Sequence, residues 1–291
     1  ALKAAGKLDK VRMLLLTNCT FDGIVYNVER VMEECLAIKP DLIFLWDEAW
    51  FAFARFNPIY RMRTGMNAAG VLRERLKSPD HKKAYEAQQN RLEGADDATL
   101  LNTRLIPSPE ARVRVYATQS THKTLTSLRQ GSMIHVNDQD FKGEVEQSFH
   151  EAYMTHTSTS PNYQIIASLD VGRRQVELEG FEFVQRQIEA AMSMRRAIST
   201  HPLLQKYFKV LTYGEMIPDA HRDSGVESYY DPEQGWTDIW ECWEKDEFAL
   251  DASRVTLLVG GTGWDGDTFK TKILMDKYGI QINKTSRNTV L

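Results

Sequence analysis

The feature that most constrains this fold is an apolar run, an amphipathic helix and a second apolar run in close succession. Val11–Leu16 is apolar and bounded by polar turn residues, which is typical of a buried strand. Asn27–Lys39 places its apolar residues on one stripe and stops at Pro40, as an amphipathic helix does. Asp41–Trp46 then predicts a second strand. Strand, helix and strand in this order predict an α/β fold with a mainly parallel sheet flanked by helices.

The remaining sequence predicts two domains in a chain of 291 residues. Residues 71–112 are so rich in charge that we interpret them as a solvated insertion with a surface helix. Residues 1–172 are expected to belong to a large domain and residues 173–291 to begin a smaller α+β domain. Further expected elements are strands at Val113–Ala117, Val255–Val259 and Ile280–Asn283, a long helix at Phe181–Arg196 and a loop-like stretch at 213–243.

Composition excludes several classes of function. The chain has 36 Lys and Arg against 40 Asp and Glu, a net charge of −4, so it lacks a basic field for nucleic acid. No apolar run is long enough to span a membrane, and none at the N-terminus resembles a signal peptide. The three cysteines, Cys19, Cys35 and Cys242, show no metal-ligand spacing. We therefore expect no metal, no disulfide framework and a cytoplasmic location.

Two ionisable residues follow predicted strands, where ligands of parallel α/β sheets bind. Lys123 closes the segment Ser120–Lys123, and a desolvated lysine there is nucleophilic, although a lone lysine is more often a surface residue. Asp47 follows the second strand, where it either caps a helix or pairs with a cation. A nucleophilic amine and a carboxylate that keeps a pyridine ring protonated together indicate a site for pyridoxal 5'-phosphate (PLP).

Several segments carry a resemblance to a known family. They resemble segments of the bacterial ornithine/lysine/arginine decarboxylases, and the resemblance covers nearly the whole chain. It implies the aspartate-aminotransferase-like (type I) PLP fold, with residues 1–172 as the C-terminal part of the large PLP-binding domain. It also implies PLP-dependent decarboxylation of a basic amino acid to the amine and CO2. The segments are Asp47–Trp50, Ser120–Lys123, Arg129–His135 and Glu151–Pro161, with further matches at Thr17–Gly23 and Val255–Leu258.

The resemblance further implies roles for single residues. Lys123 is similar to the lysine that forms the Schiff base with PLP, and Asp47 is similar to the partner of the pyridine nitrogen. Ser120 and His122 resemble the pair that flanks the cofactor phosphate and the reacting centre, which makes His122 a candidate catalytic residue. Trp50 resembles a tryptophan of the cofactor pocket. Lys123, Asp47 and His122 are thus the expected catalytic residues.

Ser158 resembles a hydroxyl residue that reaches the cofactor phosphate of a neighbouring subunit. The resemblance thereby implies a homodimer, or a larger homo-oligomer, with shared active sites. Direct cofactor roles for residues of the 17–23 loop stay open. For His135 and His156, which also match family positions, a structural role is the favoured interpretation.

The sequence departs from the family pattern in three ways. The interval between Asp47 and Lys123 is unusually long, which the insertion at 71–112 explains. The family's upstream cofactor-stacking aromatic residue and first phosphate-binding loop have no counterpart, so we expect a central fragment of a longer enzyme. Asn283 precedes Lys284 and Thr285 where relatives often carry an acid for the distal amine of the substrate, which makes Asn283 the candidate substrate residue. An aminotransferase or aldolase-like reaction, or a non-catalytic dimerising homologue, stays open because fold alone does not set the reaction.

Overall fold

The computed structural model describes residue 2 and residues 4–291. The chain forms two compact units. The first unit comprises Ala1–Asn18 and Val28–Gly180, and the second comprises Cys19–Asn27 and Phe181–Leu291. The short segment Cys19–Asn27 thus leaves the first unit, and the chain returns to that unit at Val28. The expected division at residue 172 stays a prediction about the domains of the whole protein.

A four-stranded sheet is the framework of the first unit. Its strands are ordered β1 (Met13–Thr17), β3 (Ile43–Asp47), β4 (Arg114–Ser120) and β5 (Ser132–Asp138). The first three are parallel, and β5 is antiparallel to β4. The three strands expected from the apolar runs are confirmed as β1, β3 and β4. The sequence did not predict β5, because its apolar residues are few and interrupted by polar ones.

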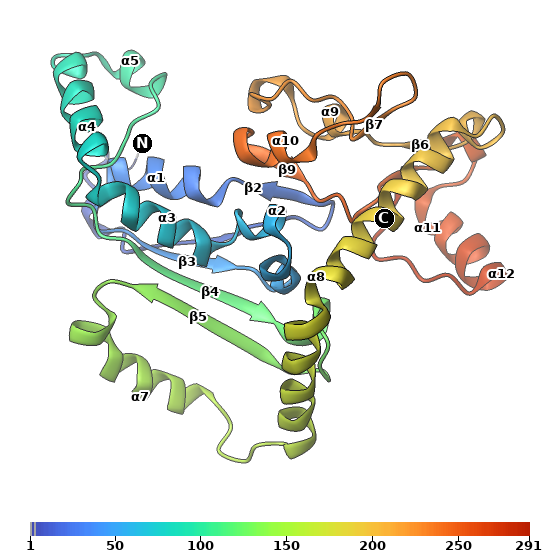
Figure 1. The fold of residues 1–291 in the computed structure, drawn as a ribbon, viewed down its shortest axis with the longest axis horizontal. Coiled ribbons are helices and arrows are strands. Elements are labelled where there is room, and N and C mark those ends of the chain that lie inside the picture. Colours follow the sequence, from blue (N-terminus) through green and yellow to red (C-terminus); the bar gives the residue numbers. More distant parts are fainter. Residues whose placement is uncertain (1, 3) are drawn as a thin grey trace. The chain divides into compact units, whose positions relative to one another are not determined.

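Two helices cover one face of this sheet, α1 (Val28–Ile38) and α3 (Gly65–Lys77) (Figure 1). Alternate residues of β3 and β4 point into the same core, as the period of two in a strand requires. Burial of these side chains is the main stabilising contribution of the unit. The fully or almost fully buried members include Val28, Met32, Leu36, Phe44, Trp46, Ala68, Ala69, Leu72, Val113, Val115 and Ala117.

The opposite face of the sheet is covered less completely. The helix α7 (Glu146–His156) approaches it through Phe149, whose ring stacks on Tyr116 with the centroids 6.3 Å apart. Leu15 on the edge strand β1 remains 61% exposed. Further helical segments of the unit are Leu8–Lys10, Ala52–Phe56, α2 (Pro58–Arg61), α6 (Thr121–Thr124), Phe141–Val145 and the first half of α8 (Tyr163–Thr200).

Helix α8 is much longer than the expected helix at Phe181–Arg196, since it has 38 residues. Its N-terminal half contains glycines where the chain packs closely. A Cβ on Gly172 would lie 2.1 Å from the carbonyl oxygen of Thr126, so no other residue fits there without a shift. Sequence periodicity missed this half because it is largely polar and exposed. Neither α8 nor any other helix in the described part of the chain is both long enough and apolar enough to cross a membrane.

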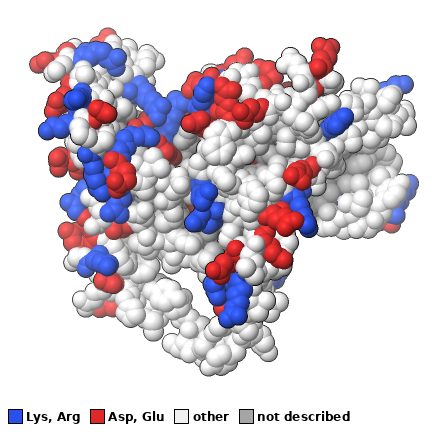
Figure 2. Space-filling model, viewed as in Figure 1, with Lys and Arg blue, Asp and Glu red and all other residues white. Residues whose placement is uncertain are grey.

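The charged region after α3 contains two further helices, α4 (Pro79–Leu92) and α5 (Asp97–Leu101). Only one surface helix was expected there. The beginning of the expected insertion, residues 71–77, instead completes α3, and Leu72 and Leu76 lie in the core. Lysines, arginines and acidic residues are intermixed over the part of the first unit that carries α4 and α5, without a patch of one sign on the face shown in Figure 2.

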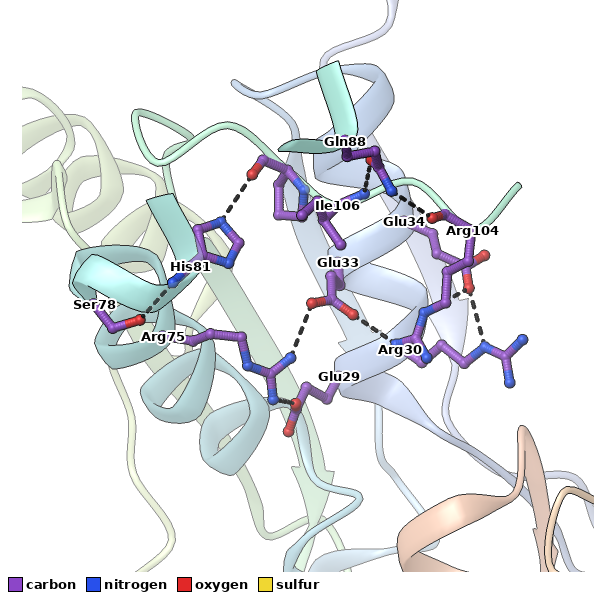
Figure 3. Close-up of polar contacts among 11 residues, drawn as sticks. Glu29, Arg30, Glu33, Glu34, Arg75, Ser78, His81, Gln88, Arg104 and Ile106 are labelled. Carbon is purple, nitrogen blue, oxygen red and sulfur yellow. Dashed lines mark hydrogen bonds and ion pairs between the residues drawn. The ribbon is translucent and has the colours of Figure 1, made fainter. Parts of the chain in front are cut away.

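Polar contacts attach this region to α1 (Figure 3). The buried carboxylate of Glu33 pairs with Arg75 at 2.9 Å and with Arg104 at 2.6 Å. Arg75 precedes α4 and Arg104 follows α5, so one carboxylate binds the chain on both sides of the two helices. Gln88 of α4 adds hydrogen bonds to the backbone of Arg104 and Ile106, each of 3.0 Å.

The second unit consists of short elements. β2 (Ile24–Tyr26) pairs antiparallel with β9 (Phe248–Leu250), β10 (Leu257–Leu258) lies between β6 (Lys209–Val210) and β11 (Thr289–Val290), and β7 (Tyr230–Asp231) pairs with β8 (Gly235–Trp236). Its helices are the second half of α8, α9 (Tyr213–Met216), α10 (Ile239–Lys245), α11 (Gly266–Thr268), α12 (Asp276–Tyr278) and the helical segments Leu204–Lys206, Asp219–His221, Gly260–Thr262 and Phe269–Met275.

Two expectations for this unit need correction. The strand expected at Val255–Val259 is shortened to the two residues of β10. The strand expected at Ile280–Asn283 does not form. Instead, the backbone N–H of Asn283 donates a 2.8 Å hydrogen bond to the carbonyl of Leu291, which closes a loop around β11. A few apolar residues in a row do not specify a strand when neighbouring polar residues bond locally.

Candidate active site

The parallel strands of the first unit end together, and Asp47 lies at that edge. It is the last residue of β3 and stands in register between Thr17 of β1 and Thr118 of β4. One carboxylate oxygen, Oδ1, accepts a 3.0 Å hydrogen bond from the backbone N–H of Ala49, which stabilises the turn after the strand. The other oxygen accepts no hydrogen bond from the described residues. Asp47 therefore caps a turn and still has an oxygen available for a ligand.

Lys123 lies one turn of helix beyond the end of the neighbouring strand. It belongs to α6, which starts directly after β4, and its side chain is exposed. The Nζ atom lies 5.5 Å from the ring centroid of Trp50, which is in the turn that follows Asp47. The ring face attracts the ammonium group electrostatically. The structure thus brings the lysine of one motif to the tryptophan of another, although many residues separate them in the sequence.

The other expected residues of this edge have defined environments. Ser120 ends β4 opposite Ser132 of β5. The Nδ1 atom of His122 lies 2.9 Å from the carbonyl oxygen of Gly131. A carbonyl can only accept, so Nδ1 carries the proton and Nε2 remains a proton acceptor. His122 is therefore oriented by the backbone, as a general acid or base requires.

A buried polar chain behind this edge was not identified from the sequence. Glu48 is fully buried and accepts hydrogen bonds from the backbone N–H of Gly65 at 2.6 Å and from Nε2 of Gln119 at 2.7 Å. Gln119 Oε1 in turn lies 3.1 Å from Nε2 of His135. The pKa of Glu48 is raised to about 7, because burial and the adjacent charge of Asp47 outweigh the two hydrogen bonds, which lower it. The only sequence signal was that Glu48 follows Asp47 directly.

Burial also lowers the pKa of His135, which favours the neutral imidazole. It lines a cavity of about 370 Å³ within the first unit. The cavity is mostly apolar, with Gln119 and His135 among its polar groups. Other lining residues are Phe56, Met133, Leu169 and Val176.

Two expected site residues lie apart from this cluster. Ser158 is exposed in the turn after α7, where its Oγ accepts a 3.1 Å hydrogen bond from the N–H of Ser160. Asn283 is exposed in the second unit, in the loop described above. Residues of the 17–23 segment are divided, since Asn18 is buried in the first unit whereas Asp22 pairs with Lys284 at 3.4 Å in the second. His156 is exposed at the end of α7.

A family model described as "Orn/Lys/Arg decarboxylase, major domain" matches residues 1–77 and 103–291. The chain belongs to this family. The gap in the match, residues 78–102, is narrower than the expected insertion at 71–112 and contains α4 and α5. The resemblance seen in the sequence is thereby confirmed.

Individual relatives agree with this membership. The chain is 33% identical over 197 residues to the lysine decarboxylase LdcA of Pseudomonas aeruginosa, covering 67% of this chain and 21% of that protein. It is 27% identical over 300 residues to the inducible lysine decarboxylase of Escherichia coli, covering 95% and 33%. A biodegradative arginine decarboxylase of Escherichia coli is 28% identical over 285 residues, covering 89% and 32%. The chain therefore spans about a third or less of the length of these relatives.

Solved structures confirm the expected fold. Lysine decarboxylase A from Pseudomonas aeruginosa superposes with a TM-score of 0.60 at 26% identity, over 98% of this chain and 36% of that one. The constitutive lysine decarboxylase of Escherichia coli gives a TM-score of 0.58 at 22% identity, over 96% and 33%. The α/β architecture with a mainly parallel sheet is the one that the resemblance implied.

Proposed function

We propose that this chain forms part of a PLP-dependent decarboxylase that converts a basic amino acid to its amine and CO2. The observation that carries the proposal is the arrangement at the strand ends. There, Asp47 has an available carboxylate oxygen and Lys123 presents its amine to the ring of Trp50. Membership of the decarboxylase family supports the reaction type. The relatives named above act on lysine or arginine, which supports a basic substrate.

The donor set fits PLP. The primary amine of Lys123 is the group that condenses with an aldehyde, and the carboxylate of Asp47 is the group that keeps a pyridine nitrogen protonated. Ser120 supplies a hydroxyl for the phosphate, and Trp50 supplies an apolar wall. When bound, PLP supplies an electron sink for the electron pair left behind as CO2 departs. Each of these residues lies at the carboxyl edge of the sheet, where α/β folds bind ligands.

The remaining steps concern protons. His122 holds its proton on Nδ1, because this atom faces the carbonyl of Gly131, and offers Nε2 to the reacting centre. After CO2 leaves, the substrate carbon needs one proton, which Lys123 can deliver as an ammonium group, or His122 once its Nε2 has taken up a proton. The carboxylate of Asp47 is the group that would hold a proton on the ring nitrogen.

The decisive experiment uses the full-length protein. Borohydride reduction followed by peptide mapping should place a pyridoxyl group on Lys123, and incubation with lysine, ornithine and arginine should release one CO2 for each amine formed. A pyridoxyl group on another lysine would refute the site. Transfer of the amino group, or cleavage between Cα and Cβ, would replace decarboxylation by the rival reactions of this fold. A protein that binds no PLP would favour the non-catalytic homologue.

The partner is proposed to be a second copy of the same chain. Ser158 is exposed and makes no hydrogen bond to the residues at the strand ends, which is what a residue serving a neighbouring subunit requires. Mixing Lys123→Ala chains with Ser158→Ala chains should partly restore activity, because one site of each heterodimer then contains neither defect. Verified subunit exchange without recovery would contradict a shared site.

Asn283 is proposed to meet the distal amine of the substrate. An amide accepts a hydrogen bond from a cation but contributes no charge, and bonds to a charged acceptor are about twice as strong. We therefore expect weaker preference among basic amino acids than an acid at this position would give. The relative kcat/KM values from the product assay test this, since a strong preference would place recognition elsewhere. We further expect the enzyme to work in the cytoplasm, because few and scattered cysteines suit a reducing compartment.

A further inference from the structure

We propose that Glu48 is a positioning residue of the candidate active site, which acts through Gln119 to hold the ends of β3 and β4 together and to set the tautomer of His135. The proposal goes beyond the residues that the resemblance implies, and its link to turnover rests on the proposed function. It is carried by a continuous chain of hydrogen bonds across three segments of the first unit.

The first link in this chain of hydrogen bonds joins the turn after β3 to the start of helix α3. The backbone N–H of Glu48 donates to the carbonyl of Thr118 at 2.9 Å, which continues the β3–β4 ladder by one residue. Its carboxylate Oε1 accepts from the N–H of Gly65, the first residue of α3. A Cβ on Gly65 would lie 3.3 Å from this oxygen and 2.9 Å from Cδ1 of Trp46. Gly65 therefore allows the carboxylate to reach the start of the helix.

The second link, from Glu48 through Gln119 to His135, has a fixed order of donors and acceptors. An ionised carboxylate only accepts hydrogen bonds, so the amide nitrogen of Gln119 must face Glu48. The amide oxygen of Gln119 then faces His135, and an oxygen in this position requires a proton on Nε2 of the imidazole. The donors thus point from His135 to Gln119 and from Gln119 to Glu48. The charge on residue 48 decides which nitrogen of His135 carries the proton.

Glu48 and Gln119 are also close in sequence to the residues of the candidate active site. Glu48 directly follows Asp47, and Gln119 directly precedes Ser120, which is three residues from Lys123. Successive side chains of a strand point to opposite faces. The bond between Glu48 and Gln119 therefore fixes, from behind, the spacing of the two strand ends that carry Asp47 and Lys123. No salt bridge to Lys or Arg contributes to this link among the described residues, so its geometry rests on directed N–H donors.

A single exchange should reverse or break this chain. In Glu48→Gln, an NH2 group replaces one of the accepting oxygens and meets the NH2 of Gln119. If the amide oxygen introduced at position 48 stays on the N–H of Gly65, the bond to Gln119 survives only when the Gln119 amide turns over, which presents its NH2 to Nε2 of His135 and forces the proton onto Nδ1.

In the double exchange Glu48→Gln with Gln119→Glu, every hydrogen-bond donor again faces an acceptor. Gly65 then donates to the amide oxygen introduced at position 48. The amide NH2 at the same position donates to the carboxylate introduced at position 119, and His135 again donates to that carboxylate from Nε2.

The test compares these variants in the full-length protein at pH 8, where Glu48 is ionised. Nitrogen NMR of histidine-labelled protein reports the tautomer of His135, with His135→Gln used to assign the signal. Visible absorbance of the bound cofactor reports the geometry of the site. We expect Glu48→Gln to move the proton to Nδ1, to shift the absorbance and to lower kcat about 10- to 100-fold with little change in KM. The double variant should restore all of these.

The matched control is Glu33→Gln, which removes another buried carboxylate of the first unit and should leave the tautomer and the absorbance unchanged. If Glu48→Gln does not fold, Gln119→Leu breaks the same chain and should shift the absorbance in the same way. The proposal is overturned if the tautomer and absorbance of Glu48→Gln equal those of the wild type, or if the double variant fails to restore them. A protein without PLP on Lys123 refutes the proposed function instead, because the tautomer measurement does not depend on the cofactor.

Discussion

Glu33 and Glu48 are both buried carboxylates of the first unit, yet they are stabilised in different ways. The side chain of Glu33, only 6% exposed, pairs with two arginines that are themselves partly exposed. Glu48 has no exposed surface, and among the described residues it receives two N–H donors but pairs with no Lys or Arg. Removing a carboxylate from water is costly in free energy. The arginines offset that cost at Glu33, and directed hydrogen bonds offset it at Glu48.

The difference separates a structural role from a functional one. The Glu33 cluster joins α1 to the chain on both sides of α4 and α5 (Figure 3). The Glu48 chain lies at the strand ends, and its carboxyl has a pKa of about 7 because two neutral donors do not fully offset burial. A buried acid without a cation, with its pKa shifted towards neutrality, is typical of functional sites.

The largest effect is expected at Asp47, next to Glu48. Asp47→Asn should leave the fold and the Glu33 cluster intact but lower turnover about 10- to 1000-fold, because an opposite charge near a titrating group is worth roughly 1.4–4 kcal/mol. Steady-state kinetics of a PLP-loaded, folded variant measures this. Wild-type turnover would show that the ring nitrogen has another partner.

The second prediction concerns stability against pH. The pKa of Glu48 is higher in the folded protein, so between pH 4.5 and pH 7 the folded state binds more protons than the unfolded state. The contribution of Glu48 is therefore most favourable at low pH and is lost as pH rises through about 7, by about 3 kcal/mol in total. Denaturant unfolding at several pH values should show that Glu48→Gln abolishes this component. Glu33→Gln is the control and should keep the pH dependence of the wild type.

The third prediction addresses the Glu33 cluster itself. Glu33→Gln should lower the free energy of unfolding by about 1–2 kcal/mol, since two charge-assisted bonds weaken while both guanidinium groups can still turn towards water. Turnover should not change. Urea unfolding and steady-state kinetics check the two halves of this expectation, and a loss of activity at full stability would contradict the structural role.

The smallest effect is expected from the segment that the family model leaves unmatched. Replacing residues 78–102 by a short glycine-serine linker should lower stability by about 1 kcal/mol, because the bonds of Gln88 and of the buried His81 are lost while the loop becomes shorter. Turnover of the full-length protein should stay at the wild-type level. A large loss of activity would mean that α4 and α5 serve the site or a partner.

Sequence reasoning recovered the parts of the fold whose signals are local. The apolar runs of β3 and β4 are buried in one core, whereas the run of β1, expected to be buried, lies at the edge of the sheet with only Leu14 and Leu16 packed against that core. Polar residues mark where each strand ends, so Asp47 and Lys123 could be placed at one edge. The motifs identified the family, which the comparisons confirm, whereas the roles of the single residues stay predictions.

Other features depend on contacts between distant residues and could not be predicted. The pairing of β5 with β4 and the first half of α8 have weak periodicity of their own. Glu48, Gln119 and His135 form a chain only because the sheet brings them together, and each has an ordinary structural interpretation in the sequence. The strand expected at Ile280–Asn283 failed for a different reason, since backbone hydrogen bonds to the nearby Leu291 decided the conformation.

The two ion pairs of Glu33, with Arg75 and with Arg104, also have an entropic consequence. These two residues bracket the segment that the family model omits, so the ends of that segment are kept near each other whatever its length. Once the ends of a flexible loop are joined, doubling its length changes the closure free energy by only about 0.6 kcal/mol. The family framework can therefore gain, lose or exchange peptide between residues 77 and 103 with little thermodynamic consequence, which makes this junction a natural point of divergence and a suitable position for inserting a reporter.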